Sequence, residues 1–523
     1  MSRIFRFFKL YREAFFWGFL SGVLVGTTYI PFPPWALLFC YAPLWYFSLS
    51  KSRSWREILL AGWTTQFVLT LIGFHWIAYV SHEFGYMPWP VAIFLLLLFA
   101  AGMHIYIPLA LFVGVALTSK LKLKNGAAVL VLAVFLSLFE QFWPSIFTWH
   151  LGYPLLWTHS TMAQLADTIG FLGLSCGVYL LNGWVVWLLL HRNLKWTVAS
   201  TLLISLSLAF LHSQGEQKKI FWAKTDSEIK ALVVQANVGN LEKIQAEKGK
   251  GPLQSTVDRF FAQTREGLNR FPDVDLVIWP ESAFPDFLNN FAASRKLAPQ
   301  FRQFSQSIQK PIMTGAFSTD PPGKPFHDDY NAMFLFDEKA QPVGEPYHKT
   351  QLLIFGEYLP FGHQFPSLAQ YNPGGIGWGR GQGPMVWSLR DIHFGPQICY
   401  ESLDPQFSAS LAKLGADVLV NVTNDSWFGP RFEPYQNLFM TLARGLETRR
   451  PLIRSTNTGI SSAILADGTV LEQSPLFTTW AGMFSVKFLK AAPVTFYSRY
   501  GSWLPLVLLV FLSLIFAMGR RRD

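Results

Sequence analysis

Long apolar runs fill much of the first 211 residues of this 523-residue chain, and one more lies near its C-terminus. A transmembrane helix needs about 20 predominantly apolar residues, and several of these runs approach or exceed that length. The second run and the last two are shorter than the others. We therefore predict a polytopic α-helical membrane bundle of about eight spans: Ala14–Ile30, Trp35–Phe47, Ile58–Val80, Val91–Leu117, Ala127–Phe147, Ile169–Leu190, Thr197–Leu211 and Trp503–Met518.

Lysine and arginine occur only in alternate connections between the first seven runs. Such asymmetry is the positive-inside signal, which predicts that the basic connections and both termini are cytoplasmic. It also explains much of the net charge of +10, so a nucleic-acid partner is not needed to account for that charge. The first run is expected to stay as an anchor, because no small-residue cleavage site follows it. The basic residues concerned are Arg3, Arg6, Lys9, Arg12, Lys51, Arg53, Arg56, Lys120, Lys122, Lys124, Arg192, Lys195, Arg520, Arg521 and Arg522.

The segment between the seventh and eighth runs has a different pattern, in which short β-branched strands alternate with amphipathic helices. It is large enough to bury its own core, and we predict an α/β or α+β domain on the external side, which in a bacterium is the periplasm. The expected domains are a bundle over residues 1–211, a periplasmic domain over 212–499, and a C-terminal helix with a basic tail over 500–523. The strand-like runs are "IKALVVQANV", "VDLVIWP", "KPIMTGAF", "NAMFLFD", "IHFGPQI", "ADVLVNV", "PLIRSTN" and "ISSAILADGTVLEQ", and the helical ones "DPQFSASLAKLG" and "YQNLFMTLARGLETR".

Cys399 is the one cysteine of the external segment, since Cys40 and Cys176 fall within apolar runs. Without a second thiol in its own domain it is not expected to form a disulfide, which leaves a small buried hydrophobe or a nucleophile. The strand "IHFGPQI" ends at Cys399, and Asp404 and Pro405 suit the N-cap and first position of a helix. A thiol at such a strand-to-helix turn is exposed, and a helix N-terminus stabilises its thiolate. The local pattern therefore favours the nucleophile.

Two other segments hold the ionisable groups that a thiol nucleophile needs. Glu281 follows an apolar strand in "VDLVIWPES", where a proline turns the chain, and Trp279 and Val277 are expected to raise its pKa towards that of a general base. The alternative is an exposed glutamate in a turn. Lys349 precedes Glu357 by eight residues among aromatic and aliphatic side chains, which predicts a paired, partly buried cation. The alternative there is an ion pair on a solvated loop.

Together these segments resemble the nitrilase, or carbon-nitrogen hydrolase, superfamily, in which Glu, Lys and Cys occur in that order. The resemblance to one branch, the apolipoprotein N-acyltransferases, is closer and covers nearly the whole chain. In the membrane half, "FHWIAYVSHEFG" and "TWHLGYP" resemble external loops of that family. The motifs of the external domain are "WPES" at 279–282, "YHKTQLLIFGEYLPFG" at 347–362, "CYES" at 399–402, "NVTNDSWFG" at 421–429 and "RPLIRSTNTGISSAILADG" at 450–468.

The resemblance implies a role for each of six residues. Glu281 is the general base and Cys399 the nucleophile. Lys349, with the backbone N–H of Tyr400, stabilises the tetrahedral oxyanion, and Glu357 orients Lys349. Tyr400 and Glu401 line the site. At residue 244 the family often has tryptophan and this chain has isoleucine, which puts a lipid contact expected there in doubt.

The same resemblance implies a four-layer α-β-β-α sandwich for the external domain and a two-step reaction. Cys399 takes a fatty acyl chain from a membrane phospholipid as a thioester, and the free α-amine of the diacylglyceryl-modified cysteine of an apolipoprotein then attacks it. The implied partners are phospholipid, apolipoproteins and the lipid bilayer, and the implied location is the inner membrane of a bacterium. Two alternatives are a membrane-tethered amidase that acts on a soluble amide, and a transporter or sensor whose external domain binds a ligand.

Two other observations bear on the chemistry. No HExxH or CxxC motif occurs in the sequence, so neither a metal nor another cofactor is implied. Glu140 lies inside a predicted span, where burial of a charge is expensive. It is either a functional group or a carboxylate that hydrogen-bonds inside the bundle.

Overall fold

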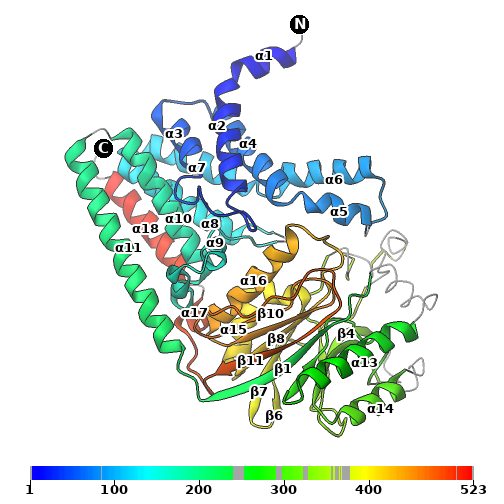
Figure 1. Ribbon diagram of the computed structural model, residues 1–523. Coiled ribbons are helices and arrows are strands. Elements are labelled where there is room, and N and C mark those ends of the chain that lie inside the picture. Colours follow the sequence, from blue (N-terminus) through cyan, green and yellow to red (C-terminus); the bar gives the residue numbers. More distant parts are fainter. Residues whose placement is uncertain are drawn as a thin grey trace. The chain divides into compact units, whose positions relative to one another are not determined.

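The computed structural model describes residues 3–83, 85–145, 147–191, 193–239, 253–289, 297–321, 328–354, 357–359, 364–365, 367, 377–501 and 503–520. The chain forms two compact units (Figure 1). The first comprises Met1–Lys219 and Tyr500–Asp523, and the second Ile220–Arg499. Helix α11 (Leu194–Trp222) continues past residue 211, where the sequence suggested a boundary, and ends in the second unit.

Helices joined by turns make up the described part of the first unit. Apart from α11 they are α1 (Arg3–Leu10), α2 (Arg12–Gly26), α3 (Ala42–Ser50), α4 (Trp55–Gly73), α5 (Trp76–Glu83), α6 (Trp89–Gly102), α7 (Tyr106–Lys120), α8 (Asn125–Phe142), α9 (Tyr153–Trp157), the 3-10 turn η1 (Thr161–Leu165), α10 (Ala166–Leu190) and α18 (Trp503–Arg520). The short helix α17 (Phe496–Tyr500) leads into α18.

Four helical stretches among the described residues are long and apolar enough to cross a membrane, and a fifth results if α4 and α5, bent by 59°, form one span. The first two expected spans coincide with shorter helices, α2 of 15 residues and α3 of nine. Because a helix rises about 1.5 Å per residue, α3 by itself is shorter than the hydrocarbon core. A bundle of apolar helices is confirmed, and the number of eight spans stays a prediction. The four stretches are Trp89–Lys120, Asn125–Phe142, Thr161–Leu190 and Leu194–Trp222.

Helices α2 and α4 pack closely because three glycines on α2, at 18, 22 and 26, share one helix face. A Cβ atom on Gly22 would lie 2.6 Å from Val68 Cβ, and one on Gly26 would lie 2.8 Å from Ile72 Cβ. Both distances are too short for real carbon atoms, so only glycine allows this approach. Small residues bring helices together in this way within membranes, where no water drives their association.

Glu140 lies near the C-terminal end of α8 and is buried. One carboxylate oxygen is 2.9 Å from His150 Nδ1, and the other accepts a hydrogen bond from the Tyr179 hydroxyl at 2.8 Å. These contacts agree with the second interpretation of Glu140, that of a carboxylate hydrogen-bonded inside the bundle.

The second unit contains two β-sheets, and all eight strand-like runs of the sequence form strands in them. The first sheet has the order β11-β1-β2-β3-β4-β5 and the second β10-β9-β8-β7-β6. Strands β1, β2 and β3 are parallel, as are β7, β8 and β9. The strands are β1 (Ser227–Gln235), β2 (Leu276–Ile278), β3 (Ile312–Thr319), β4 (Asp329–Phe336), β5 (Tyr347–His348), β6 (Trp387–Leu389), β7 (Ile392–Ile398), β8 (Val418–Thr423), β9 (Leu452–Thr456), β10 (Ser462–Ile464) and β11 (Trp480–Phe488).

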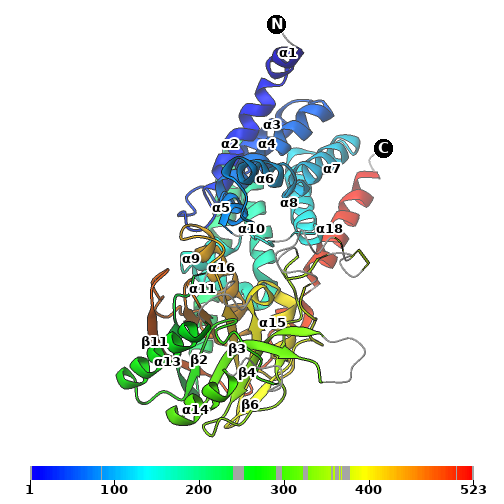
Figure 2. The same cartoon turned by 90° about the vertical axis from the view of Figure 1, so that its right-hand side faces the viewer.

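Helices cover the outer face of each sheet, which confirms the predicted α/β domain (Figures 1 and 2). Helices α13 (Leu253–Arg270) and α14 (Ala298–Ile308) pack on the first sheet, and α15 (Pro405–Lys413) and α16 (Glu433–Thr448) accompany the second. The inner faces meet through contacts such as the hydrogen bond from Thr456 Oγ1 on β9 to Gln235 Oε1 on β1, at 3.3 Å. Each sheet is therefore buried on both faces, which explains the nearly continuous apolar strands.

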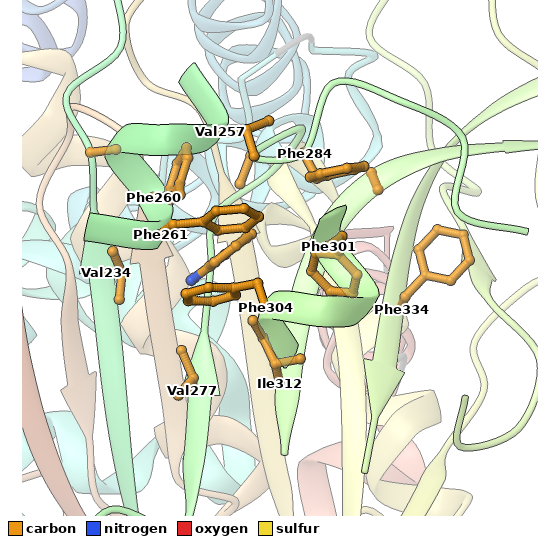
Figure 3. Close-up of a cluster of buried hydrophobic side chains, with 14 of the residues drawn as sticks. Val234, Val257, Phe260, Phe261, Val277, Phe284, Phe301, Phe304, Ile312 and Phe334 are labelled. Carbon is orange, nitrogen blue, oxygen red and sulfur yellow. The ribbon is translucent and has the colours of Figure 1, made fainter. Parts of the chain in front are cut away.

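Aromatic side chains fill the layer between the first sheet and its two helices (Figure 3). Phe260 and Phe261 of α13 face Phe301 and Phe304 of α14, and the rings of Phe261 and Phe304 stack with centroids 4.0 Å apart. Trp279, which follows β2, lies in the same cluster. These large apolar groups fix β2 against its helices and so hold the chain that continues to residue 281.

Candidate active site

Glu281, Lys349 and Cys399 each follow directly or closely after a strand, namely β2, β5 and β7. The carboxyl ends of parallel strands share one edge of a sheet, and ligand sites of α/β proteins form at that edge. Glu281 and Lys349 follow strands of the first sheet and Cys399 follows a strand of the second, and the structure brings the three residues together. Lys349 Nζ lies 3.1 Å from Glu281 Oε1, and the Cys399 thiol interacts electrostatically with both side chains.

Lys349 is buried between two carboxylates. Its Nζ donates hydrogen bonds to Glu281 Oε1 at 3.1 Å and to Glu357 Oε1 at 2.7 Å, and the side chain is 1% exposed. Burial alone would lower the pKa of Lys349, but the charges of Glu281 and Glu357 raise that pKa well above its ordinary value. Lys349 is thus a fixed cation. The expected pairing with Glu357 is observed, and the solvated-loop alternative is wrong.

Asn331 on β4 is a further member of this cluster that sequence reasoning missed. Its amide nitrogen Nδ2 donates to Glu281 Oε1 at 2.8 Å and to Glu357 Oε1 at 3.0 Å. Its backbone carbonyl accepts a hydrogen bond from the Lys349 N–H at 2.8 Å. Asn331 therefore holds the two carboxylates and the lysine in one arrangement. The signal in the sequence is faint: a polar residue near the start of the buried run "NAMFLFD".

Glu281 is buried in polar surroundings, in contrast to the apolar environment that the sequence suggested. Besides Lys349 and Asn331, it accepts a hydrogen bond at Oε2 from the backbone N–H of Asn424 at 3.0 Å. Trp279 and Val277 belong to the aromatic core beneath α13 and α14. The expectation that these two side chains adjoin the carboxylate is wrong, because the chain turns after Trp279 and sends Glu281 into the polar cluster.

Cys399 begins the 3-10 turn η3 (Cys399–Leu403) and has a left-handed backbone with φ of 51°. A non-glycine residue in this region is strained, and such strain concentrates at functional sites. Asp404 caps α15, as expected, by accepting from the Gln406 N–H at 2.8 Å. The other four residues of η3 and the N-cap Asp404 lie between Cys399 and the first residue of that helix.

Burial, and next the charge of Glu281, raise the pKa of the Cys399 thiol above its ordinary value, while the charge of Lys349 opposes the shift. Burial therefore favours the neutral thiol at Cys399. Such a thiol becomes a nucleophile only when a base takes its proton. The nearby Glu281 carboxylate has the chemistry of that base.

Glu401 ties the nucleophile strand to the loop after β5. Its Oε1 accepts from the Tyr347 hydroxyl at 2.5 Å and from the Thr350 N–H at 2.6 Å, and its Oε2 accepts from the Ile398 N–H at 2.7 Å. Burial raises the pKa of Glu401 to about 7, and these hydrogen bonds oppose the shift. Glu401 is completely buried, and its hydrogen bonds position the strand before Cys399 and the segment after Lys349. That it also lines the site stays a prediction.

Tyr400 lies between the nucleophile and Glu401 and is partly exposed. Burial, and next the charge of Asp404, raise the pKa of its phenol to about 12, so the hydroxyl stays protonated at neutral pH. Tyr400 directly follows Cys399 and so lies beside it. Its role in lining the site stays a prediction. Ile244 lies outside the described residues.

The chemistry of this cluster is that of a thiol, a carboxylate and a buried cation. No group of three or more His, Cys, Asp or Glu side chains that could hold a metal ion occurs in the part of the chain that the structure describes. A thiol, a carboxylate and a buried cation are the kinds of group that covalent acyl transfer requires.

Two family models match the chain. Residues 227–481 match the carbon-nitrogen hydrolase family, and residues 21–184 match the apolipoprotein N-acyltransferase N-terminal domain.

Curated relatives match almost from end to end. The apolipoprotein N-acyltransferase of Bdellovibrio bacteriovorus is 48% identical over 526 residues, covering 99% of this chain and 96% of that protein. The one of Geobacter metallireducens is 26% identical and covers 98% of this chain and 96% of that protein. Among solved structures, the carbon-nitrogen hydrolase from Helicobacter pylori G27 is 15% identical with a TM-score of 0.37, covering 50% of this chain and 89% of that one.

Proposed function

The chain belongs to the apolipoprotein N-acyltransferase family and N-acylates lipoproteins, and on that premise we propose that the acyl group passes through a thioester on Cys399. The observation that supports this best is the Lys349 ammonium group, buried between Glu281 and Glu357 beside the thiol. A cation held in this way costs no reorganisation when an oxyanion develops next to it.

In the first half-reaction Glu281 takes the thiol proton and Cys399 Sγ attacks the ester carbonyl of a phospholipid. The tetrahedral oxyanion is stabilised by Lys349 Nζ and by the backbone N–H of Tyr400. Its collapse breaks the ester C–O bond, and the leaving alkoxide of the lysophospholipid receives the proton from Glu281. The products are the thioester and a neutral alcohol, with Glu281 again ionised.

In the second half-reaction the free α-amine of the diacylglyceryl-cysteine attacks the thioester carbonyl. Glu281 takes the amine proton, the same two donors stabilise the oxyanion, and the C–S bond breaks. The leaving thiolate of Cys399 then takes the proton from Glu281, which restores the resting thiol. The product is an amide at the N-terminus of the lipoprotein.

Three other residues support these steps. Glu357 and Asn331 fix the direction of Lys349, because both bind atoms of the same cluster. Glu401 fixes the backbone on either side of Cys399 and next to Lys349. The two donors of the oxyanion hole are thus attached to one framework.

The acyl donor and the acceptor are both lipids, which explains why the enzyme carries a bundle of apolar helices. We propose that residues 1–211 and 500–523 cross the bacterial inner membrane eight times, and that residues 212–499 form the periplasmic catalytic domain. The alternation of basic and uncharged connections supports this orientation.

Reporter fusions test the topology. A reporter fused after residue 522 is expected to be cytoplasmic and one inserted next to Asp320 periplasmic, because the lysine and arginine asymmetry orients the spans. Both are measured with a pair of reporters that are active on opposite sides of the membrane. The same side for both positions would contradict the single crossing that the last apolar run is proposed to make between the external domain and the C-terminus.

Trapping the acyl-enzyme tests the thioester. Purified protein incubated with phospholipid, without an amine acceptor, is expected to gain one acyl mass on the peptide that contains Cys399, in a form that hydroxylamine removes. Peptides with Cys40 and Cys176 are internal controls, since both are buried in the first unit.

Adding a diacylated lipopeptide with a free N-terminus is expected to discharge this mass, and an N-acetylated lipopeptide is expected to leave it in place. Discharge by water at the same rate as by the amine would support the amidase alternative. Full transfer activity in Cys399→Ala would refute the covalent route altogether.

A further inference from the structure

Two side chains hydrogen-bond the backbone carbonyl group of Cys399. Its oxygen accepts a hydrogen bond from Ser402 Oγ at 3.0 Å and another from Asn421 Nδ2 at 3.3 Å. These donors lie on different elements, the turn η3 and the strand β8. Together they fix the peptide group that joins Cys399 to Tyr400, and so keep the left-handed backbone of the nucleophile in place.

A third side chain reaches the thiol itself. The β7–β8 register pairs Ile398 with Val422, so Thr423 ends β8 beside Cys399. The Thr423 hydroxyl, which lowers the pKa of the Cys399 thiol, donates to Asp425 Oδ1 at 3.2 Å. A hydroxyl has one proton to donate, and a thiolate is a stronger acceptor than a thiol. Ionisation of Cys399 therefore favours donation from Thr423 to sulfur.

Arg454 on β9 is completely buried and hydrogen-bonds residues that make or support all three contacts. Its Nη1 donates to Asn421 Oδ1 at 2.8 Å and to Thr441 Oγ1 at 3.0 Å, and its Nη2 donates to Asp425 Oδ2 at 2.7 Å. Thr441 Oγ1 is in turn 2.8 Å from Ser402 Oγ. Each partner of the guanidinium group thus either contacts Cys399 or contacts the residue that does.

We propose that Arg454 is a positioning residue of the nucleophile, which fixes the Cys399 carbonyl through Asn421 and through Thr441 with Ser402, and the thiol through Asp425 with Thr423. This inference rests on the proposed role of Cys399 as the nucleophile. Arg454 acts through its neighbours and touches no reacting atom.

The geometry requires arginine at this position. The planar guanidinium group presents donors in fixed directions and serves three acceptors on β8, α16 and the segment after β8 at once, which the single ammonium group of lysine does not reproduce. The charge is balanced locally by Asp425. Glu433 is also buried, and its burial and the charge of Asp425 raise its pKa well above its ordinary value.

Two sets of variants of the full-length protein in lipid nanodiscs test the proposal. The first pair is Arg454→Lys and, as a matched control, Arg449→Lys. Arg449 is also fully buried, and its Nη1 donates to the Ala466 carbonyl. None of its described hydrogen bonds reaches Cys399. The second pair is Thr423→Val, which keeps the shape but loses the hydroxyl, and Thr423→Ser, which keeps the hydroxyl.

Two quantities are measured: the single-turnover rate of Cys399 acylation by phospholipid, and the rate of alkylation of Cys399 by iodoacetamide between pH 6 and 10. Acylation by Arg454→Lys is expected to fall about 10- to 100-fold with an unchanged KM, since displacement of a reacting group by an ångström has effects of this size. Arg449→Lys is expected to acylate at the rate of the unchanged protein.

Thr423→Val is expected to acylate about 10-fold more slowly, and its alkylation curve is expected to move to higher pH by about one unit, since a donor to the thiolate is lost. The groups that face the thiol, Glu281, Lys349 and Glu357, are unchanged in this variant. Thr423→Ser is expected to recover most of the rate and the original curve.

Unchanged acylation and alkylation in both Arg454→Lys and Thr423→Val would overturn the inference, as would an equal loss in Arg449→Lys. Cys399→Ala is run beside them. If it still transfers the acyl group, the proposed function fails, whereas the alkylation readout continues to report on the positioning of the thiol.

Discussion

Lys349→Met is expected to lower the rate of acyl transfer by at least ~10²–10³-fold, the loss seen when one preorganised donor to an oxyanion is removed. Methionine has nearly the same length as lysine and no charge, so the substitution removes the cation with little change in volume. The expected effect is on the rate of thioester formation, measured in a single turnover with phospholipid, and not on the affinity for phospholipid.

This variant also leaves Glu281 and Glu357 adjacent without their shared cation, which is expected to destabilise the domain, because an uncompensated buried charge is costly. The double variant Lys349→Met with Glu357→Gln separates the two effects. It removes one of the two carboxylates, so the melting temperature is expected to recover in part while the transfer rate stays low.

Lys339→Met is the surface control, since Lys339 is exposed, and it is expected to transfer at the normal rate. Recovery of activity together with stability in the double variant would mean that Lys349 serves only to balance charge. The assignment of Lys349 to the oxyanion would then be wrong.

The strands of the catalytic domain are predictable because their signal is local. Runs such as "ADVLVNV" are β-branched, apolar and bounded by turn residues, and the structure has β8 in that position. The N-cap at Asp404 and the proline after it likewise predict the start of α15. Glu281 and Cys399 are predictable as candidates because each follows such a strand, and Lys349 because it and Glu357 are ionisable groups in a stretch rich in aromatic and aliphatic residues.

The residues that position Glu281, Lys349 and Cys399 were not predictable from the local sequence pattern. Asn331 binds Glu281, 50 residues away, and Arg454 binds Asn421, 33 residues away. Inside an apolar strand each is a single polar residue, and its partner is set by the strand order within one sheet, as for Asn421 and Arg454, which lie opposite each other on β8 and β9. Glu401 is a similar case: its position after Cys399 and Tyr400 predicts a place near the thiol, but its hydrogen bond with Thr350, 51 residues away, is not predictable from the local pattern.

The number of membrane spans is uncertain from the sequence because hydropathy locates apolar runs and not helix breaks. The run at 91–117 corresponds to two helices, α6 and α7, and the run at 58–80 to α4 and α5 with a bend of 59° between them. Breaks of this kind depend on neighbouring helices that satisfy the freed backbone groups, and such contacts are not encoded in the apolar pattern of one segment.

Glu281→Gln is expected to slow formation of the thioester by about 10²–10⁴-fold, the range that general-base catalysis supplies, because an amide does not accept the thiol proton. Glutamine retains the size of glutamate, and its carbonyl oxygen can still accept from Lys349 and Asn331, whose contacts with Glu281 are at 3.1 Å and 2.8 Å. The contact that is lost is the one from the Asn424 N–H to Oε2 at 3.0 Å, because an amide NH2 group does not accept. The substitution therefore removes the proton acceptor and keeps the contacts with Lys349 and Asn331. Glu345→Gln, at an exposed position, is the matched control and is expected to be unaffected.

The pH dependence of the residual rate identifies the base. Burial raises the pKa of the Cys399 thiol, so without Glu281 the nucleophile forms only by direct ionisation. The residual acylation rate of Glu281→Gln is then expected to rise about tenfold for each pH unit until the thiol pKa is reached. The unchanged protein does not need this ionisation, and its rate is expected to level off once Glu281 is deprotonated. If Glu281→Gln acylates Cys399 at the normal rate near neutral pH, the base is another residue. If its residual rate does not change with pH, the lost carboxylate positions Lys349 and does not accept the thiol proton.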